Sequence, residues 1–250
     1  MQLFYNPDIT PNAYCTLDAE ESRHAVRVLR MREGDELNVT DGRGALYRCN
    51  IIQADSGKCI VESVSKLSTL NSQLSTIHLA VAPTKNPSRM EWLVEKAVEI
   101  GVGEITLLDC DHSERTFLKT DRLEKLAVSA MKQSLHTVLP KINPAVKLRD
   151  WLNSQLPAEA REPDERTANC QLKFIAHCEA DKPRVPLASA LLPGRDVVVL
   201  IGPEGDFSGD EIALALECGF QPVSLGSARL RTETAALYAV TAFNLINDRI

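Results

Sequence analysis

Two segments in the last fifth of the chain combine glycines with charged side chains after apolar runs. Residues 200–208 read Leu-Ile-Gly-Pro-Glu-Gly-Asp-Phe-Ser, and residues 225–235 read Leu-Gly-Ser-Ala-Arg-Leu-Arg-Thr-Glu-Thr-Ala. Each apolar run predicts a strand, and the glycines allow backbone N–H groups to approach a ligand closely. Ligands of open α/β sheets bind where strands end, so we expect the two turns to form one pocket.

The first of these turns is not a known nucleotide fingerprint. It lacks the third glycine of a dinucleotide site and the Gly-Lys-Ser/Thr of a phosphate loop. Taken alone, it is more typical of a strand–helix turn that binds no ligand.

The second turn places Arg229 and Arg231 near a helix start, where positive charge is unfavourable. A broken local rule often marks a site, and two arginines suit an anion such as a phosphate backbone. The alternative is a plain helix start, with Thr232 as its cap and Glu233 in its first turn.

A third basic group lies in a helix expected over residues 19–30. Arg23, Arg27 and Arg30 fall within a ~60° arc, opposite an apolar side that includes Val28 and Leu29. The stripe is either a solvated face, which is the commoner meaning, or a patch for a polyanion. The distinction matters because the net charge of −6 disfavours a polyanionic partner overall. Other basic residues near this helix or near predicted strand ends are His24, Lys85, Arg89 and Arg115.

Several kinds of chemistry are excluded by the residue inventory. The five histidines show no metal-ligand spacing and no obvious serine or cysteine partner, so we expect no metal. The seven cysteines are scattered without a Cys-x-x-Cys pair, which indicates reduced thiols in the cytoplasm. No apolar run approaches the ~20 residues of a membrane span, and no secretory signal is visible. Catalysis would then rest on positioning two substrates, with one general base.

Two domains are expected, the first over residues 1–70 and the second over residues 76–250. In the first, short strands at 2–5, 13–16, 36–40, 45–51 and 58–64 predict a small mixed β barrel, with a turn at 41–44. The polar, Ser/Thr-rich residues 65–75 are interpreted as a linker.

In the second domain, strands and helices alternate. Strands are expected at 76–82, 104–109, 171–177, 197–201 and 222–225, and helices at 89–100, 122–135, 209–217 and 233–247. This order predicts an α/β fold with a mostly parallel sheet covered on both faces. Ser88, Asp121 and Ser208 fit helix N-caps, and Gly101 and Gly219 fit helix C-termini. Residues 157–169 are expected to form an exposed loop.

Two helices carry apolar side chains outside a single core-facing stripe. In the helix over 89–100, Trp92 falls on the charged side. The last helix is apolar nearly all round over 235–246, so every side of it must pack against other protein surface. Core burial and contact with a second subunit are left as equal alternatives.

Together the two glycine-bearing segments resemble the RsmE family, bacterial methyltransferases of small-subunit ribosomal RNA in the SPOUT superfamily. Three further segments agree: residues 24–30 with 34–35, the Asp-Gly-Arg-Gly at 41–44, and residues 95–102. Two positions depart from the pattern. Residues 132–136 read Lys-Gln-Ser-Leu-His where the family often has Glu-Gln-Ser/Cys-x-Arg, and Asp206 replaces a frequent glycine.

The resemblance implies a PUA-like RNA-binding barrel followed by a SPOUT domain with a trefoil knot near the C-terminus. It further implies a homodimer that uses S-adenosylmethionine to methylate N3 of a uridine in 16S ribosomal RNA of the small ribosomal subunit. Two alternatives stay open: a non-catalytic RNA-binding protein of ribosome assembly, or a SPOUT enzyme for ribose 2′-oxygen or transfer-RNA guanine.

The resemblance also assigns residues to roles. The catalytic candidates are Arg231, Glu233, Glu204 and Arg229. Cofactor contacts are expected from Leu200, Ile201, Gly202, Glu204, Gly205, Leu225, Gly226, Leu230, Thr234 and Ala235. RNA contacts are expected from Arg23, His24, Arg27, Arg30, Lys85, Arg89 and Arg115.

Overall fold

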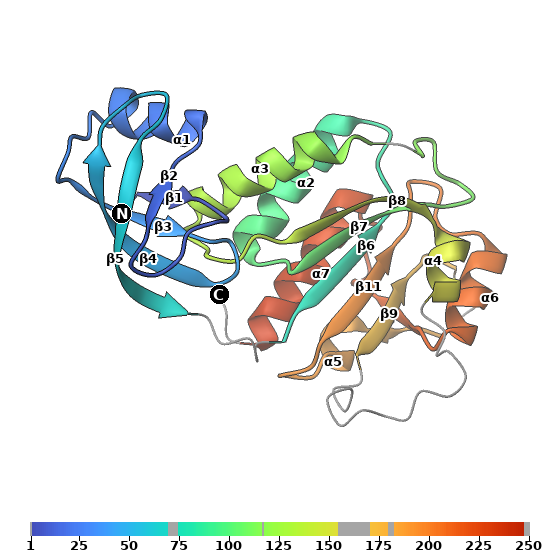
Figure 1. Ribbon diagram of the computed structural model, residues 1–250. Coiled ribbons are helices and arrows are strands. Elements are labelled where there is room, and N and C mark those ends of the chain that lie inside the picture. The colour runs from blue at the N-terminus through green and yellow to red at the C-terminus, as the bar shows by residue number, and fades with distance from the viewer. Residues whose placement is uncertain (1, 70–74, 117, 155–170, 180–182, 248–250) are drawn as a thin grey trace. The chain divides into compact units, whose positions relative to one another are not determined.

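The computed structural model describes residues 2–69, 75–116, 118–154, 171–179 and 183–247 (Figure 1). The loop expected at 157–169 lies outside these residues. The chain divides into two compact units. One contains Met1–Leu74 together with Val128–Leu139, and the other contains Ser75–Ala127 and Pro140–Ile250. No helix in the described ranges is long and apolar enough to cross a membrane.

The first unit is built on a curled, mixed five-stranded sheet, as the sequence predicts. Its strand order is β1-β3-β4-β5-β2, and β1 pairs parallel to β3 while the other pairs are antiparallel. The strands are β1 (Leu3–Tyr5), β2 (Tyr14–Thr16), β3 (Glu36–Thr40), β4 (Ala45–Gln53) and β5 (Ile60–Thr69). The linker interpretation is wrong for residues 65–69, because they extend β5 along β4 as far as the pair Ala45–Thr69. A ladder uses backbone groups, so serines and threonines at its edge do not prevent pairing.

The N-terminal helix differs from the expected α-helix over 19–30. It is α1 (Ala19–Arg23), capped by Asp18, followed by a π-helix, η1 (His24–Val28). The wider π turn rotates the later side chains, so the predicted apolar side is wrong for Val28 and Leu29, which are 63% and 39% exposed.

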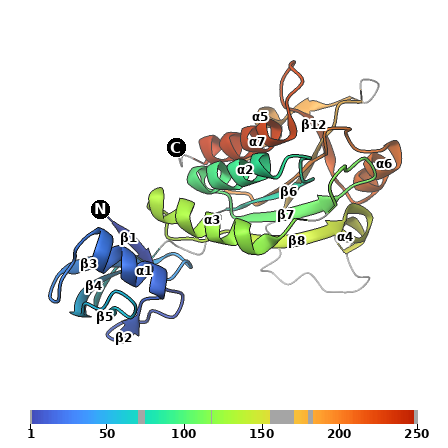
Figure 2. The same cartoon turned by 90° about the horizontal axis from the view of Figure 1, so that it is seen from above.

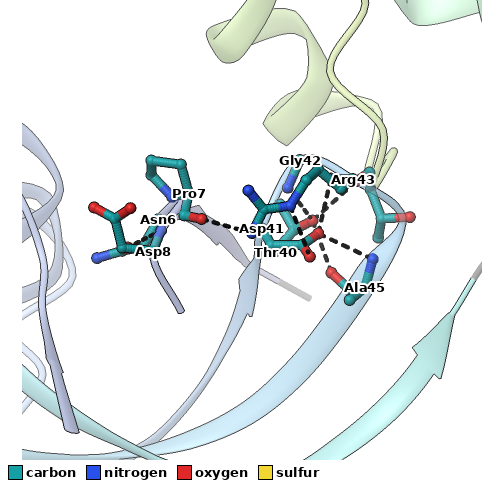
Figure 3. A network of polar contacts seen from close by, with 9 residues as sticks. Asn6, Pro7, Asp8, Thr40, Asp41, Gly42, Arg43 and Ala45 are labelled. Atoms are coloured by element: carbon teal, nitrogen blue, oxygen red, sulfur yellow. Dashed lines mark hydrogen bonds and ion pairs between the residues drawn. The ribbon is translucent and has the colours of Figure 1, made fainter. Parts of the chain in front are cut away.

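The Asp-Gly-Arg-Gly segment forms the expected turn between β3 and β4 (Figure 3). Asp41 Oδ1 accepts hydrogen bonds from the backbone N–H groups of Arg43 and Ala45, at 2.7 and 3.0 Å. Thr40 Oγ1 lies within hydrogen-bond distance of both the Ala45 and Thr137 carbonyl oxygens, at 2.9 and 3.0 Å, and its one proton is shared between them. Residues 137–139 therefore pack on this turn, which explains why this later segment belongs to the first unit.

The second unit contains a fully parallel seven-stranded sheet of order β10-β12-β9-β11-β6-β7-β8. The strands are β6 (Ile77–Val81), β7 (Glu104–Asp109), β8 (Lys141–Lys147), β9 (Leu172–Ala176), β10 (Val185–Pro186), β11 (Val197–Ile201) and β12 (Gln221–Ser224). The predicted parallel α/β architecture is confirmed. β8 and β10 were not expected, because Pro144 and Pro186 interrupt the apolar patterns from which strands are predicted.

Helices cover both faces of this sheet, as predicted (Figures 1 and 2). On one face α2 (Pro87–Ile100) packs beside α7 (Thr232–Ile246), which also contacts β6 and β11. On the other, α4 (Leu148–Ser154) and α6 (Gly209–Glu217) enclose a core that includes Trp151, Leu200 and Ile212. The remaining helices are α3 (Thr120–Gln133) and the short α5 (Leu187–Ala190).

The helix ends confirm some sequence signals and correct two. Asp121 is not an N-cap, because it lies in the first turn of α3, which begins at Thr120. Ser208 and Glu211 form the predicted capping box of α6. Gly101 ends α2 in a left-handed conformation, at φ 111°. The cap of α2 is Asn86, not Ser88: its side chain accepts from the Ser88 N–H, and Pro87 starts the helix. Proline suits that position because the first helical N–H has no helical partner.

Candidate active site at the carboxyl edge of the parallel sheet

The two glycine-bearing turns lie together, as the sequence predicts. The first follows β11, and the second lies between β12 and α7. The hydroxyl of Thr232 donates to the Gly202 carbonyl at 3.1 Å, which joins the two turns directly. Thr232 is the first helical residue and Arg231 the N-cap, so the interpretation of Thr232 as the cap is wrong. Its hydroxyl bonds across the site instead.

Three loops at this edge are tied through Lys85. Glu204 Oε1 accepts a hydrogen bond from the Lys85 backbone N–H at 3.1 Å, and Arg115 Nε donates to the Lys85 carbonyl at 3.2 Å. The Lys85 ammonium lies 2.7 Å from Glu114 Oε2, and this hydrogen bond raises the pKa of Lys85. The carboxylate of Glu204 therefore organises the loop after β6, and Arg115 holds the same loop from the β7 side.

Asp206 explains one departure from the family pattern. Its backbone is left-handed, at φ 66°, a conformation in which glycine is favoured. Asp206 Oδ2 accepts from the Cys178 N–H at 2.7 Å, and Oδ1 accepts from the Phe207 N–H at 2.9 Å. Aspartate tolerates this conformation when its short side chain bonds locally. The carboxylate thus anchors the turn to the segment after β9.

The glycines of the site fall into two classes. A Cβ on Gly202 would lie 3.1 Å from the Phe207 ring, and one on Gly205 would lie 3.0 Å from the His112 Cβ. Internal packing therefore explains these two glycines. Gly226 has a left-handed φ of 111°, and among the described residues beyond its chain neighbours no heavy atom lies within 4 Å of the position that a Cβ would take. Its backbone is therefore accessible to a ligand.

The apolar residues of the two segments also differ in what they offer a ligand. Leu200 and Ile201 are fully buried in the sheet, so their side chains belong to the core. Leu225 and Leu230 are half-buried, and Thr234 is exposed while Ala235 is buried. Only the later segment therefore presents accessible apolar side chains beside Gly226.

The charged candidates of the second turn have contrasting environments. Arg229 and Arg231 are both exposed. The Glu233 side chain is 10% exposed, and its Oε1 lies 3.7 Å from Nε of Arg89 in the first turn of α2. Arg89 is thus brought to the same edge as Glu233, although the two are far apart in sequence.

Asp111 and His112 follow β7 at this edge. His112 was expected near this strand end, whereas Asp111 was not anticipated. His112 Nδ1 lies 3.1 Å from the Asp206 carbonyl oxygen. Asp111 accepts from the Ser208 hydroxyl at 2.7 Å and pairs with Arg149, and these contacts, the hydroxyl first, lower the pKa of Asp111. Their position directly after β7 was the available signal, since parallel strands end at a common edge.

The basic residues of the first unit that were expected to contact RNA are mostly exposed. The ~60° arc predicted for Arg23, Arg27 and Arg30 assumes a regular α-helix, whereas Arg27 lies in η1 and Arg30 follows it with a left-handed φ of 57°. Arg23, Arg27 and Arg30 are exposed, whereas His24 is half-buried with its ring 5.9 Å from that of Phe4. The departure at Lys132 is also explained here: its ammonium pairs with Glu21, whose side chain is only 4% exposed.

Comparison with known proteins defines the class to which this fold and site belong. A family model described as an RNA methyltransferase domain matches residues 71–244, and one described as an RNA methyltransferase PUA domain matches residues 17–62. The ribosomal RNA small subunit methyltransferase E of Buchnera aphidicola from Acyrthosiphon pisum is 29% identical, over 96% of this chain and 91% of the relative.

Solved structures agree over the whole chain. The crystal structure of a protein from Porphyromonas gingivalis, described as a probable rRNA methyltransferase, is 40% identical with a TM-score of 0.85, covering 99% of both chains. That of ribosomal RNA small subunit methyltransferase E from Neisseria gonorrhoeae, bound to S-adenosyl methionine, is 26% identical with a TM-score of 0.79, covering 99% of this chain and 98% of that one. The chain belongs to this family of ribosomal RNA small subunit methyltransferases, the RsmE family that its motifs resemble.

Proposed function

We propose that the protein transfers a methyl group from S-adenosylmethionine to N3 of a uridine in 16S ribosomal RNA of the small subunit. The observation that carries this proposal is the hydrogen bond between Thr232 and Gly202. It joins the two glycine-bearing turns into a single site. The alternative of a non-catalytic protein rested on the altered residues 132–136. The pairing of Lys132 with Glu21 gives one of these residues a structural role and so weakens that support.

The residues at the carboxyl edge fit the cofactor. The open backbone at Gly226 and the accessible Leu225 and Leu230 side chains can contact an adenine, and main-chain groups can read its edge. The sulfonium of the bound cofactor supplies the methyl group for an in-line displacement. For Leu200 and Ile201 the proposal is limited to backbone contacts, since their side chains are buried.

The chain's own contribution is to orient the uridine and to manage the charge on its N3. The exposed guanidinium of Arg231 belongs to the same turn as Gly226 and can stabilise negative charge on N3 as its proton passes to solvent water. Arg229 is placed to hold the base or its phosphate. Holding N3 and the methyl carbon at ~3–3.5 Å supplies much of the acceleration. The uridine must be unstacked to enter the site.

RNA binding is assigned to two sets of basic residues. In the PUA-like unit, proposed over residues 1–70, the exposed Arg23, Arg27 and Arg30 would contact phosphates, with His24 beside them. In the methyltransferase unit, proposed over residues 76–250, Lys85, Arg89 and Arg115 lie at the edge that holds the candidate site.

A homodimer is proposed from the outer face of α7. An apolar groove of about 600 Å³ runs along this face, lined by Ala188, Thr234, Leu237, Tyr238, Thr241, Ala242, Leu245 and Ile246. Leu245 is 58% exposed, and a stripe of this kind along a helix marks a protein interface.

We further propose the family's trefoil knot near the C-terminus and a cytoplasmic location, where small subunits are found.

The direct test supplies tritiated S-adenosylmethionine and small ribosomal subunits that lack the mark. We expect label in 16S RNA, and mass spectrometry of the digested nucleosides should identify 3-methyluridine. Label on a ribose oxygen or in transfer RNA would assign another SPOUT activity. Binding of RNA without heat on titration of the cofactor would instead indicate an inert scaffold, and either result would overturn the proposal.

A further inference from the structure

Glu233, one of the expected catalytic residues, is buried at the start of α7. Its side chain is nine-tenths buried, and Oε2 is buried without a hydrogen-bond donor among the described residues. Oε1 faces Nε of Arg89 at 3.7 Å. A general base has to reach the proton that it removes, at ~2.6–3.2 Å between heavy atoms. The burial of Oε2 and the pairing of Oε1 with Arg89 therefore favour a contact with Arg89 over an approach by a nucleobase.

Arg89 has the opposite character. Its side chain is 38% exposed, and its Nε lies 3.7 Å from Oε1 of Glu233. A guanidinium carries five N–H donors in a planar fork, and the pair of terminal nitrogens matches the geometry of a phosphate. Arg89 and Glu233 lie in the first turns of α2 and α7, and positive helix N-termini favour a carboxylate such as Glu233 there.

We infer that Glu233 is a positioning residue that holds Arg89 by its Nε edge, so that Arg89 presents its terminal nitrogens to a phosphate of the substrate RNA. The pair thus acts on RNA binding and not on removal of the N3 proton. This inference rests on the proposed function, since it takes RNA as the anion. If the Arg89 guanidinium moves closer to Glu233 when RNA binds, it also donates a hydrogen bond to the buried Oε2 of Glu233.

The test is a double-mutant cycle on the full-length protein with Glu233→Gln, Arg89→Ala and both together. Steady-state kinetics use unmethylated small subunits at several salt concentrations. We expect each single variant to raise KM for the subunit about tenfold, with kcat changed less than about threefold. The double variant should be no worse than Arg89→Ala, because the two residues act through one contact. Glu233→Gln and Arg89→Ala should each also lower the slope of log affinity for the subunit against log salt concentration by about 0.7–0.9, because each loses one phosphate contact.

The opposite outcome would identify a base. If Glu233→Gln lowers kcat at least a hundredfold, removes the acidic limb of the kcat–pH profile and leaves KM unchanged, the positioning role is wrong.

Glu233→Asp, which keeps the charge, should restore part of the lost affinity for the subunit. Glu217→Gln, on the exposed side of α6, is the matched control and should change nothing.

Two further measurements separate folding failure and failure of the proposed function. Cofactor affinity by calorimetry should stay within about twofold of wild type in every variant, which shows an intact site. If the wild-type protein methylates another position, the cycle is repeated on RNA binding alone. Matching losses in Arg89→Ala and Glu233→Gln would then support the pair, and an RNA affinity that neither variant changes would overturn it.

Discussion

At Asp206 a carboxylate holds a left-handed backbone position, through hydrogen bonds from the Cys178 and Phe207 N–H groups. Asp206→Ala removes both bonds and leaves a strained φ, so we expect a loss of about 1–3 kcal/mol in unfolding free energy. Asp206→Gly should lose less, because glycine accepts the same φ without strain. Urea unfolding measures both, with Asp8→Ala, at another exposed aspartate, as control. Equal stability of Asp206→Ala and wild type would refute the anchoring role.

Arg231 is expected to act on the reaction more than on cofactor binding. Its side chain is exposed at the start of α7 and is not used as a helix cap. Arg231→Ala should lower kcat about a hundredfold, while the Kd for S-adenosylmethionine changes less than about twofold. Kinetics and calorimetry on the same preparations measure the two effects, with Arg229→Ala compared in parallel. An equal fall in turnover and cofactor affinity would move Arg231 into the cofactor site.

At the scale of elements, the last turns of α3 belong to the first unit. There Lys132 pairs with the buried Glu21 of α1. Lys132→Met leaves that carboxylate buried without its cation, so we expect a loss of about 3 kcal/mol near pH 8. Burial already raises the pKa of Glu21 against the influence of Lys132. Without Lys132 the carboxyl takes up a proton in mild acid, so the loss should shrink toward pH 5.

The matched comparison for this pair is the double variant Glu21→Gln/Lys132→Met, measured by urea unfolding at both pH values. Removing both charges should restore most of the stability that Lys132→Met loses. A single variant as stable as the wild type would show that the pair contributes nothing.

His78 makes the stability of the parallel sheet depend on pH. Its Nε2 lies 2.8 Å from Thr106 Oγ1 on the neighbouring strand, and burial lowers its pKa although Glu104 opposes the shift. The unfolded chain binds a proton at His78 near the ordinary pKa of 6.5, while the folded chain binds it only at lower pH. The stability contribution is therefore complete above that pH and is lost as the pH falls below it.

Urea unfolding at pH 8 and pH 5.5 tests this behaviour. The wild type should lose more stability between the two values than His78→Gln does, whereas the exposed His112→Gln should follow the wild type. Identical pH slopes for wild type and His78→Gln would contradict the assignment.

At the scale of the whole molecule, the outer face of α7 is the feature that calls for a partner. Leu245→Glu places a charge in the apolar groove, so the protein should sediment as a monomer where the wild type sediments as a dimer. Leu216→Glu on α6 makes the same change at a residue 38% exposed outside the groove and should stay dimeric. A monomeric wild type would remove the basis of the proposed dimer.

Much of the architecture could be predicted because it follows from short-range patterns. The bounds of β3, β7, β11 and α6 agree residue for residue with apolar runs and cap signals in the sequence. The junction of η1 and α1 could not be predicted, since the 3.6-residue periodicity assumes a regular helix. The pairing of 65–69 with β4 is a long-range contact, which a Ser/Thr-rich composition does not reveal.

For the candidate site, spacing and composition were enough to select the two glycine-bearing segments and the residues within them, because strand ends and turn residues are local properties. Only the tertiary structure decided which side chains face one another there: Thr232 with Gly202, Glu204 with Lys85, and Glu233 with Arg89. These contacts join segments from 30 to more than 100 positions apart. Their geometry depends on how the sheet and its helices pack, which no local pattern encodes.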